Sequence, residues 1–256
     1  MLPKLRPLLV VAFLLLAASA TAASQDERFR ERQVLDPVTG EWLDDAPALD
    51  GDPLNEARAL LVERRPDRAR RLLQRWLREN RDDERYYEGV FLLGESYFLG
   101  RDFWAAAKQY EIVADSTAGE LFMRAIERIM DVARAFLAGE KRIVWGFLRL
   151  PAYDDGIELL DRAWSRVPGT RLGELALKLK ADYFYERGDF AAAQDEYALL
   201  VREYPNGQYA RVAMLRAAES ANAMFRSPRH DDSPLIEAAE RYQQLQGAYP
   251  EYAARE

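Results

Sequence analysis

The chain contains no cysteine and only one histidine, His230. Without cysteine it can form no disulfide, thiolate nucleophile or thiolate zinc site, and it cannot carry a lipid on a cysteine. A single histidine, here in the polar stretch RSPRHDDS, can build neither a histidine-rich metal site nor a Cys–His pair, and we expect a solvated loop residue. The sequence also lacks a glycine-rich phosphate loop. We therefore expect no metal, no cofactor and no enzymatic activity.

Basic residues are outnumbered by acidic ones, 36 against 43, so the formal net charge is −7. Bulk electrostatics will not draw a chain of this charge to nucleic acid or to anionic lipid. Adjacent acids occur in RDDERYYE, AYDDG and RHDDS, but acids at the start of a helix are usually caps and dipole partners rather than catalytic groups. The expected partners are proteins, with no nucleic acid and at most peripheral contact with a membrane.

Long hydrophobic runs are absent except at the start of the chain. There, Lys4 and Arg6 precede the apolar run LLVVAFLLLAA (residues 8–18), which small residues follow. This layout is typical of a secretory signal cleaved after Ala22, and the run is shorter than the roughly 20 residues of a transmembrane helix. The pattern predicts a signal peptide over residues 1–22 and an exported protein. An uncleaved N-terminal anchor is the alternative.

Residues 23–52 contain proline, glycine and acids but no helical period, and the pattern predicts a flexible linker. Pro37 and Gly40 in DPVTGEW suit a tight turn. Trp42 and Leu43 are the only large apolar pair in this segment. They either fold the linker onto the rest of the protein or contact a partner.

From residue 53 onward, alanine and leucine recur at three- and four-residue spacing, which predicts an all-α protein. Two stretches, SYFLGRDFWAAAKQYEIVA and YFYERGDFAAAQDEYALLV, align without a gap. In each, glycine ends one helix, aspartate caps the next and phenylalanine packs at the corner. Gly94 and Ala181 are small residues at which a second helix, carrying Tyr110 or Tyr197, can approach closely. This helix–turn–helix sequence pattern is typical of the tetratricopeptide repeat, a unit of about 34 residues.

Weaker copies of the same pattern extend over residues 53–256 and predict about five helix pairs. Proline residues end the third, fourth and fifth units at Pro168, Pro205 and Pro250. Stacked pairs bury a continuous core while each pair contacts only its neighbours. We therefore predict a tetratricopeptide-repeat α-solenoid, shaped as a curved rod. The helices expected outside the two clear copies span about residues 54–64, 67–80, 119–137, 208–225 and 234–248, and a further helix with Tyr153, Gly156 and Leu160 precedes Pro168.

The third unit contains an insertion, residues 140–152, between its two helices, where the clear copies need only a few residues. Its sequence, EKRIVWGFLRLPA, is more apolar than a loop without a structural or binding role would be. Trp145 and Phe147 either fold back to fill a gap in the stack or present a hydrophobic contact to a partner. The gap-filling role is the favoured interpretation.

The first helix of each pair in such a stack lines the concave face, which makes the residues along it candidates for partner binding. Phe91 and Phe98 suggest a groove for an extended or helical apolar segment, with packing against a neighbouring helix as the alternative. The full set of candidates is Glu88, Phe91, Glu95 and Phe98 on the second pair, Lys178, Asp182 and Tyr185 on the fourth, and Trp145 and Phe147 in the insertion.

The ends of the units follow a more specific pattern. In REYPNGQYARVAML and GAYPEYAARE a second helix ends in Tyr-Pro, and Tyr-Ala opens the next helix after a short step. With five repeats and an export signal, residues 54–256 resemble the BamD (YfiO) family of outer-membrane assembly factors. The resemblance implies a place in the periplasm or on the periplasmic face of the outer membrane, with the barrel-assembly machinery or unfolded outer-membrane proteins as partners. The family's lipid-bearing cysteine is missing here, so the resemblance does not supply an anchor.

Two other functions are compatible with parts of the sequence. The first is a CpoB-type periplasmic repeat protein that coordinates cell-envelope construction and division, since its repeats share the Tyr-Pro ends. Such proteins usually carry an N-terminal coiled coil and about three repeats, and residues 23–52 show no heptads. The second is a murein hydrolase with a catalytic glutamate, which would need a separate catalytic domain that the chain has no residues left to form.

Overall fold

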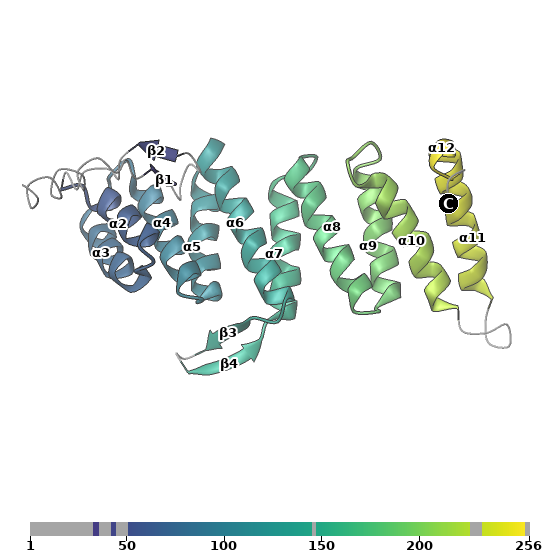
Figure 1. The fold of residues 1–256 in the computed structure, drawn as a ribbon, viewed down its shortest axis with the longest axis horizontal. Coiled ribbons are helices and arrows are strands. Elements are labelled where there is room, and N and C mark those ends of the chain that lie inside the picture. Colours follow the sequence, from purple (N-terminus) through teal and green to yellow (C-terminus); the bar gives the residue numbers. More distant parts are fainter. Residues whose placement is uncertain (1–32, 36–41, 45–50, 145–146, 226–231, 254–256) are drawn as a thin grey trace, which may run out of the picture.

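A computed structural model describes residues 33–35, 42–44, 51–144, 147–225 and 232–253. Within these ranges the chain forms a single row of α-helices, an elongated rod with a β-hairpin on one side (Figure 1). The predicted all-α tetratricopeptide-type solenoid is confirmed. The predicted signal peptide, the turn residues Pro37 and Gly40, and His230 lie outside the described residues.

The described residues form five helix pairs, and the helices begin and end close to the predicted positions. Each helix packs mainly against the helix before it and the helix after it, as expected for a repeat stack. The first helices of successive pairs also contact each other, α2 with α4, α4 with α6, and α6 with α8, which places first helices on the inner side of the row. The pairs are α2 (Pro53–Val62) with α3 (Pro66–Glu79), α4 (Tyr86–Leu99) with α5 (Phe103–Ser116), α6 (Gly119–Leu137) with α7 (Tyr153–Arg166), α8 (Arg171–Glu186) with α9 (Phe190–Glu203), and α10 (Ala210–Met224) with α11 (Ser233–Ala248), followed by α12 (Pro250–Ala253).

The turns inside the pairs use the chemistry that the sequence indicated. Asp102 and Asp189 are the N-caps of α5 and α9, and each carboxylate accepts a hydrogen bond from the backbone N–H three residues later, at 3.2 and 3.3 Å. Just before them, the chain turns through a left-handed residue, Arg101 with φ 60° in one pair and Gly188 with φ 75° in the other. Glycine takes this conformation without strain, whereas arginine does not.

A small residue on the first helix and a tyrosine on the second set the spacing within a pair. A Cβ placed on Gly94 would lie 2.6 Å from Cε1 of Tyr110, so this helix crossing depends on glycine. In the fourth pair the equivalent residues, Ala181 and Tyr197, are buried as well. The predicted close-approach role of Gly94 is confirmed.

The Tyr-Pro ends make specific contacts between units. Tyr204 is buried, and its hydroxyl accepts a hydrogen bond from the Gly169 N–H at 3.1 Å, in the turn before α8. Five residues later, the Tyr209 N–H donates to Oε1 of Glu174 on α8 at 2.7 Å, which satisfies a free donor at the start of α10. Glu174 is itself buried. The residues around the Tyr-Pro end therefore fix the fifth pair onto the fourth.

Two short β-hairpins interrupt the helical pattern, although the sequence predicted no sheet. Strands β1 (Gln33–Leu35) and β2 (Trp42–Asp44) pair antiparallel on either side of the predicted turn. Strands β3 (Lys141–Val144) and β4 (Leu148–Pro151) form the second hairpin, inside the insertion. Among the described helices, none combines the length and the apolar composition that crossing a membrane requires.

A pair of glycine substitutions tests the packing. Gly94→Ala should lower the free energy of unfolding by about 1–3 kcal/mol, because the new methyl group overlaps the Tyr110 ring. Gly247→Ala is the matched control. It lies in α11 with no atom within 4 Å of the added Cβ, so stability should stay level or rise by up to about 1 kcal/mol through helix propensity. Urea midpoints measured by circular dichroism decide the matter, and equal effects at the two sites would contradict the close-approach role.

Candidate protein-binding surfaces

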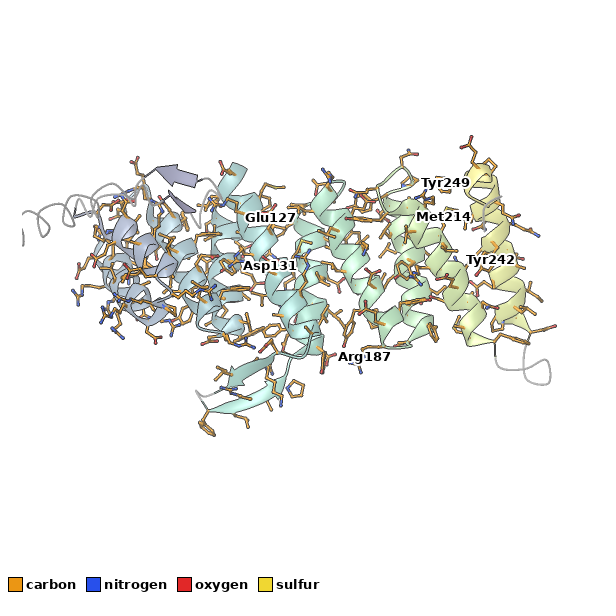
Figure 2. All side chains as sticks on the ribbon, viewed as in Figure 1. Glu127, Asp131, Arg187, Met214, Tyr242 and Tyr249 are labelled. Carbon is orange, nitrogen blue, oxygen red and sulfur yellow. The ribbon has the colours of Figure 1, made fainter. Side chains whose placement is uncertain are left out.

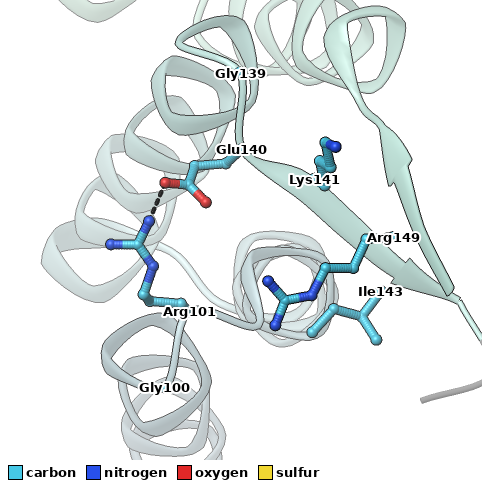
Figure 3. A pocket seen from close by; sticks show the side chains of 7 residues that line it. All are labelled: Gly100, Arg101, Gly139, Glu140, Lys141, Ile143 and Arg149. Carbon is cyan, nitrogen blue, oxygen red and sulfur yellow. Dashed lines mark hydrogen bonds and ion pairs between the residues drawn. The ribbon is translucent and has the colours of Figure 1, made fainter. Parts of the chain in front are cut away.

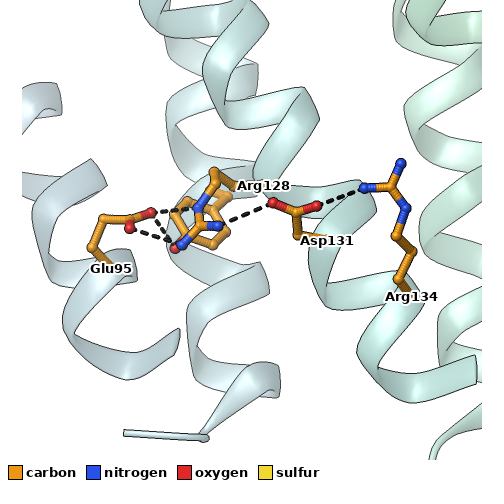
Figure 4. A network of polar contacts seen from close by, with 5 residues as sticks. Glu95, Arg128, Asp131 and Arg134 are labelled. Carbon is orange, nitrogen blue, oxygen red and sulfur yellow. Dashed lines mark hydrogen bonds and ion pairs between the residues drawn. The ribbon is translucent and has the colours of Figure 1, made fainter. Parts of the chain in front are cut away.

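A buried carboxylate joins the second helix pair to the third. Glu95 on α4 is 6% exposed and receives two parallel hydrogen bonds from Arg128 on α6, from Nε at 2.7 Å and from Nη2 at 2.8 Å. The Tyr110 hydroxyl on α5 donates to the same carboxylate at 2.6 Å. Arg128 also binds Asp131 at 3.0 Å, which in turn binds Arg134 at 2.7 Å (Figure 4). We call these five residues the Glu95 network.

The Glu95 network joins the second helix pair to the third and also reaches the surface of the protein. At its buried end, both carboxylate oxygens of Glu95 accept hydrogen bonds. The Arg128 guanidinium also lies 4.1 Å from the centre of the Phe98 ring, a favourable cation–π arrangement. Removing one partner of a buried ion pair costs about 3–5 kcal/mol because the other charge is left uncompensated. At its other end, Arg134 is exposed and Asp131 is half-buried. The network therefore runs from the buried Glu95 carboxylate to the surface on the side lined by the first helices.

The fourth and fifth pairs contain a related but looser arrangement. Tyr197 donates to Asp182 at 2.7 Å, as Tyr110 does to Glu95. Here, however, the acid pairs with Lys178 of its own helix. Arg216 of the next unit instead stacks on Tyr185, 4.6 Å from the ring centre, and binds Glu219. Lys178 stands where the second pair has Phe91. Among the described residues, Asp182 pairs with Lys178 and not with an arginine of the next unit.

Most of the predicted partner-binding residues on α4 hold the helices together. Phe91 is 1% exposed and packs on Tyr110 with ring centroids 5.5 Å apart, so packing against a neighbouring helix, the alternative interpretation, describes it. Phe98 is half-buried beneath Arg128. Glu88 forms an ion pair with Arg58 on α2.

The inner face is hollowed where α6 meets α8. A shallow pocket of about 280 Å³ combines acidic, basic and apolar side chains, and two of its residues, Glu127 and Asp131, lie midway along the rod (Figure 2). We call this pocket the inner groove. It is lined by Glu127, Met130, Asp131, Arg134, Leu172 and Leu175. The sequence prediction did not include these residues. An arginine followed three residues later by an acid occurs at 128 and at 216, but the same spacing also occurs at 64, 81, 124 and 171, so it does not single out this surface.

The insertion forms a hairpin that projects from the stack, so the favoured gap-filling interpretation is wrong for its described residues. Phe147 is 78% exposed, and β3 and β4 extend to one side of the rod (Figure 1). Only the base is anchored: Arg142 binds Asp155 at 2.9 Å and lies 5.6 Å from the Trp104 ring centre. The β-branched Ile143 and Val144 in β3 favour a paired strand here. Trp145 lies outside the described residues.

The hairpin base forms a second pocket, of about 480 Å³, with the ends of α4 and α6. Arg101 and Glu140 form an ion pair across one wall, and Arg149 extends from β4 on the other (Figure 3). Lys141 and Ile143 complete the lining together with two glycines. With three cations and one acid, the pocket is positive, and its chemistry suits an anionic group of a partner.

Within the described residues, no group of three or more acids or histidines could hold a metal ion. The geometry instead defines an α-solenoid of the tetratricopeptide type with two polar surfaces. No protein-family model and no curated protein matches the chain. Among solved structures, it is similar to a putative kinesin light chain of Podosopora anserina with nearly identical TPR-like repeats, at 13% identity and a TM-score of 0.39, over 78% of this chain and 94% of that one. A similarity this low supports no further inference, and the solenoid class rests on the helix pairs described above.

The two buried tyrosines predict a loss of stability in alkali. Burial, with the Glu95 carboxylate, raises the pKa of Tyr110 above its usual value, and burial with the Asp182 hydrogen bond raises the pKa of Tyr197. The folded state thus favours the neutral phenols. Their contribution is complete below the pKa of an unfolded tyrosine, about 10, and is lost as pH rises above it.

The variant Tyr110→Phe/Tyr197→Phe should therefore be less stable than the parent at pH 8 by about 1 kcal/mol per lost hydrogen bond. Between about pH 9 and pH 11 its free energy of unfolding should fall less steeply than that of the parent. Urea titrations at several pH values provide the measurement. Parallel pH profiles for the two proteins would show that the phenols do not couple folding to pH.

The hairpin geometry gives a separate prediction. Phe147→Ala should change the free energy of unfolding by less than about 0.5 kcal/mol, because an exposed ring loses little on truncation. Phe136→Ala, at a fully buried ring on α6, should cost about 3–5 kcal/mol. Thermal or urea unfolding compares the two. A loss above about 2 kcal/mol at Phe147 would restore the gap-filling interpretation.

Proposed function

We propose that the protein is a non-enzymatic scaffold that binds protein partners along the inner face of its solenoid. The inner groove carries this proposal. It places the Asp131 carboxylate and the Arg134 guanidinium beside the side chains of Leu172 and Leu175. Such a surface suits a partner segment with polar and apolar residues on alternate or periodic positions. Stacked helical repeats generally present extended concave surfaces of this kind.

The particular role that we propose is assembly of outer-membrane β-barrel proteins, in the periplasm or at the periplasmic face of the outer membrane. The support is the resemblance of the repeat ends to the BamD family and the specific contacts that Tyr204 and Tyr209 make at one of those ends. Strands of membrane β-barrels alternate apolar and polar residues, which matches the mixed lining of the inner groove. The proposed partners are the barrel-assembly machinery or its unfolded substrates.

Site-directed cross-linking in an envelope extract of a Gram-negative bacterium tests both parts of this proposal. Because the chain has no cysteine, one engineered thiol carries the only label. Glu127→Cys places a photoreactive group in the inner groove, and Asp195→Cys, at an exposed position on α9, is the matched control.

The proposal predicts that components of the barrel-assembly machinery, or outer-membrane proteins, cross-link to the Glu127→Cys variant and not to the Asp195→Cys variant. Equal labelling from both positions would contradict binding at the inner face. Recovery of only division or peptidoglycan proteins would contradict the barrel-assembly role and favour the CpoB-type function.

A further inference from the structure

Helix α3 has a charge opposite to that of the protein as a whole. It carries five arginines and two acids in 14 residues, in a chain with a net charge of −7. Four of these arginines recur at three- and four-residue spacing, which places them on one face of the helix, and Arg64 lies in the turn that leads into it. We call this set the arginine stripe. It consists of Arg64, Arg68, Arg71, Arg75 and Arg78.

The arginine stripe faces away from the rest of the protein. The opposite side of α3 is buried through Ala69, Leu73 and Trp76 and packs against α2 and α4. All five stripe residues are exposed. Because α3 is the second helix of the first pair, the stripe lies on the outer side at one end of the rod (Figure 1).

The stripe side chains make no polar contact with the described residues. Within the described part of the chain, no ion pair or side-chain hydrogen bond involves any of the five. Arg70, on a different side of the same helix, shows the contrast: it donates to the Ser96 carbonyl at 3.1 Å and lies 4.4 Å from the Tyr97 ring centre. Like charges three and four residues apart repel each other, so the stripe destabilises the isolated protein.

The backbone of Arg64 adds an independent observation. Arg64 occupies the left-handed turn position after α2 with φ 56°, where the third and fourth pairs have Gly139 and Gly188. The other arginine in this conformation, Arg101, forms an ion pair with Glu140. Arg64 has no such pair in the described residues, so none of them offsets the cost of its left-handed backbone with an ion pair. Strain of this kind is characteristic of functional positions.

We propose that the arginine stripe docks an acidic α-helical segment of a partner protein. From Arg68 to Arg78 the helical part of the stripe is about 15 Å long, with arginines about 5 Å apart along the axis. A helix with a carboxylate at every third or fourth position has the same charge spacing, and each guanidinium can bind a carboxylate through two hydrogen bonds.

The width of the stripe favours a helix over a larger anionic surface. Asp67 and Glu79, the two acids of α3, flank the stripe and are exposed. A planar membrane or a nucleic-acid duplex would meet these acids as well as the arginines. This surface is separate from the inner groove, and the inference does not rest on the function proposed above.

The test uses the full chain and a fluorescent alanine-rich peptide of about 21 residues, with glutamate at every third or fourth position. Anisotropy at low salt should show binding that weakens as salt is added. The triple variant Arg68→Gln/Arg71→Gln/Arg75→Gln should weaken binding by about tenfold. The charge-matched control, Arg171→Gln/Arg187→Gln/Arg202→Gln, should retain the parental affinity.

Arg64→Gly provides a second readout. It should raise the melting temperature by relieving the turn, and it should weaken peptide binding. Lack of peptide binding by the parent, an equal loss in the charge-matched control, or a fall in melting temperature for Arg64→Gly would overturn the proposal. Binding to vesicles containing phosphatidylglycerol, without binding to the peptide, would overturn it in favour of a membrane surface.

Discussion

No helix pair in this protein can bury its own apolar faces, and the rest of the structure depends on stacking each pair against the next. The Gly94–Tyr110 crossing shows how close that packing is, because a single methyl group on Gly94 would overlap the tyrosine ring. The same tyrosine positions the Glu95 carboxylate for the arginine of the following unit. Tyr110 therefore takes part both in the packing within its own pair and in the contact with the next pair, so a change in one affects the other.

The two clear copies of the repeat share this framework but complete it differently. Between the second and third pairs, a buried bidentate ion pair, Glu95–Arg128, crosses the boundary. Between the fourth and fifth, the equivalent acid pairs with Lys178 of its own helix, and the boundary is joined by stacking of Arg216 over Tyr185 and by the hydrogen bond from Tyr209 to Glu174. The boundaries on the two sides of the inner groove are thus joined by different contacts, and residues that differ between the copies determine them.

The sequence predicted the fold well because its signals are local. Asp102 and Asp189 lie beside the helices that they cap, and prolines mark helix boundaries, as Pro53 and Pro66 do at the starts of α2 and α3. The candidate surface was harder to predict because it depends on distant pairing: Glu95 meets Arg128 33 residues later, and only the rotation of α4 decides that Phe91 is buried. The hairpin was missed because its strands are four residues each, too short to stand out in a helical sequence.

Hydrogen–deuterium exchange of the Arg128→Ala variant tests the central claim, that the stack is held by contacts between neighbouring pairs. A nearest-neighbour stack opens locally where one contact is weakened. Exchange should accelerate in α4, α5 and α6, with α8 to α11 retaining the protection of the parent protein. A uniform acceleration across all helices would contradict the account, because it would mean that the solenoid unfolds as a single cooperative unit.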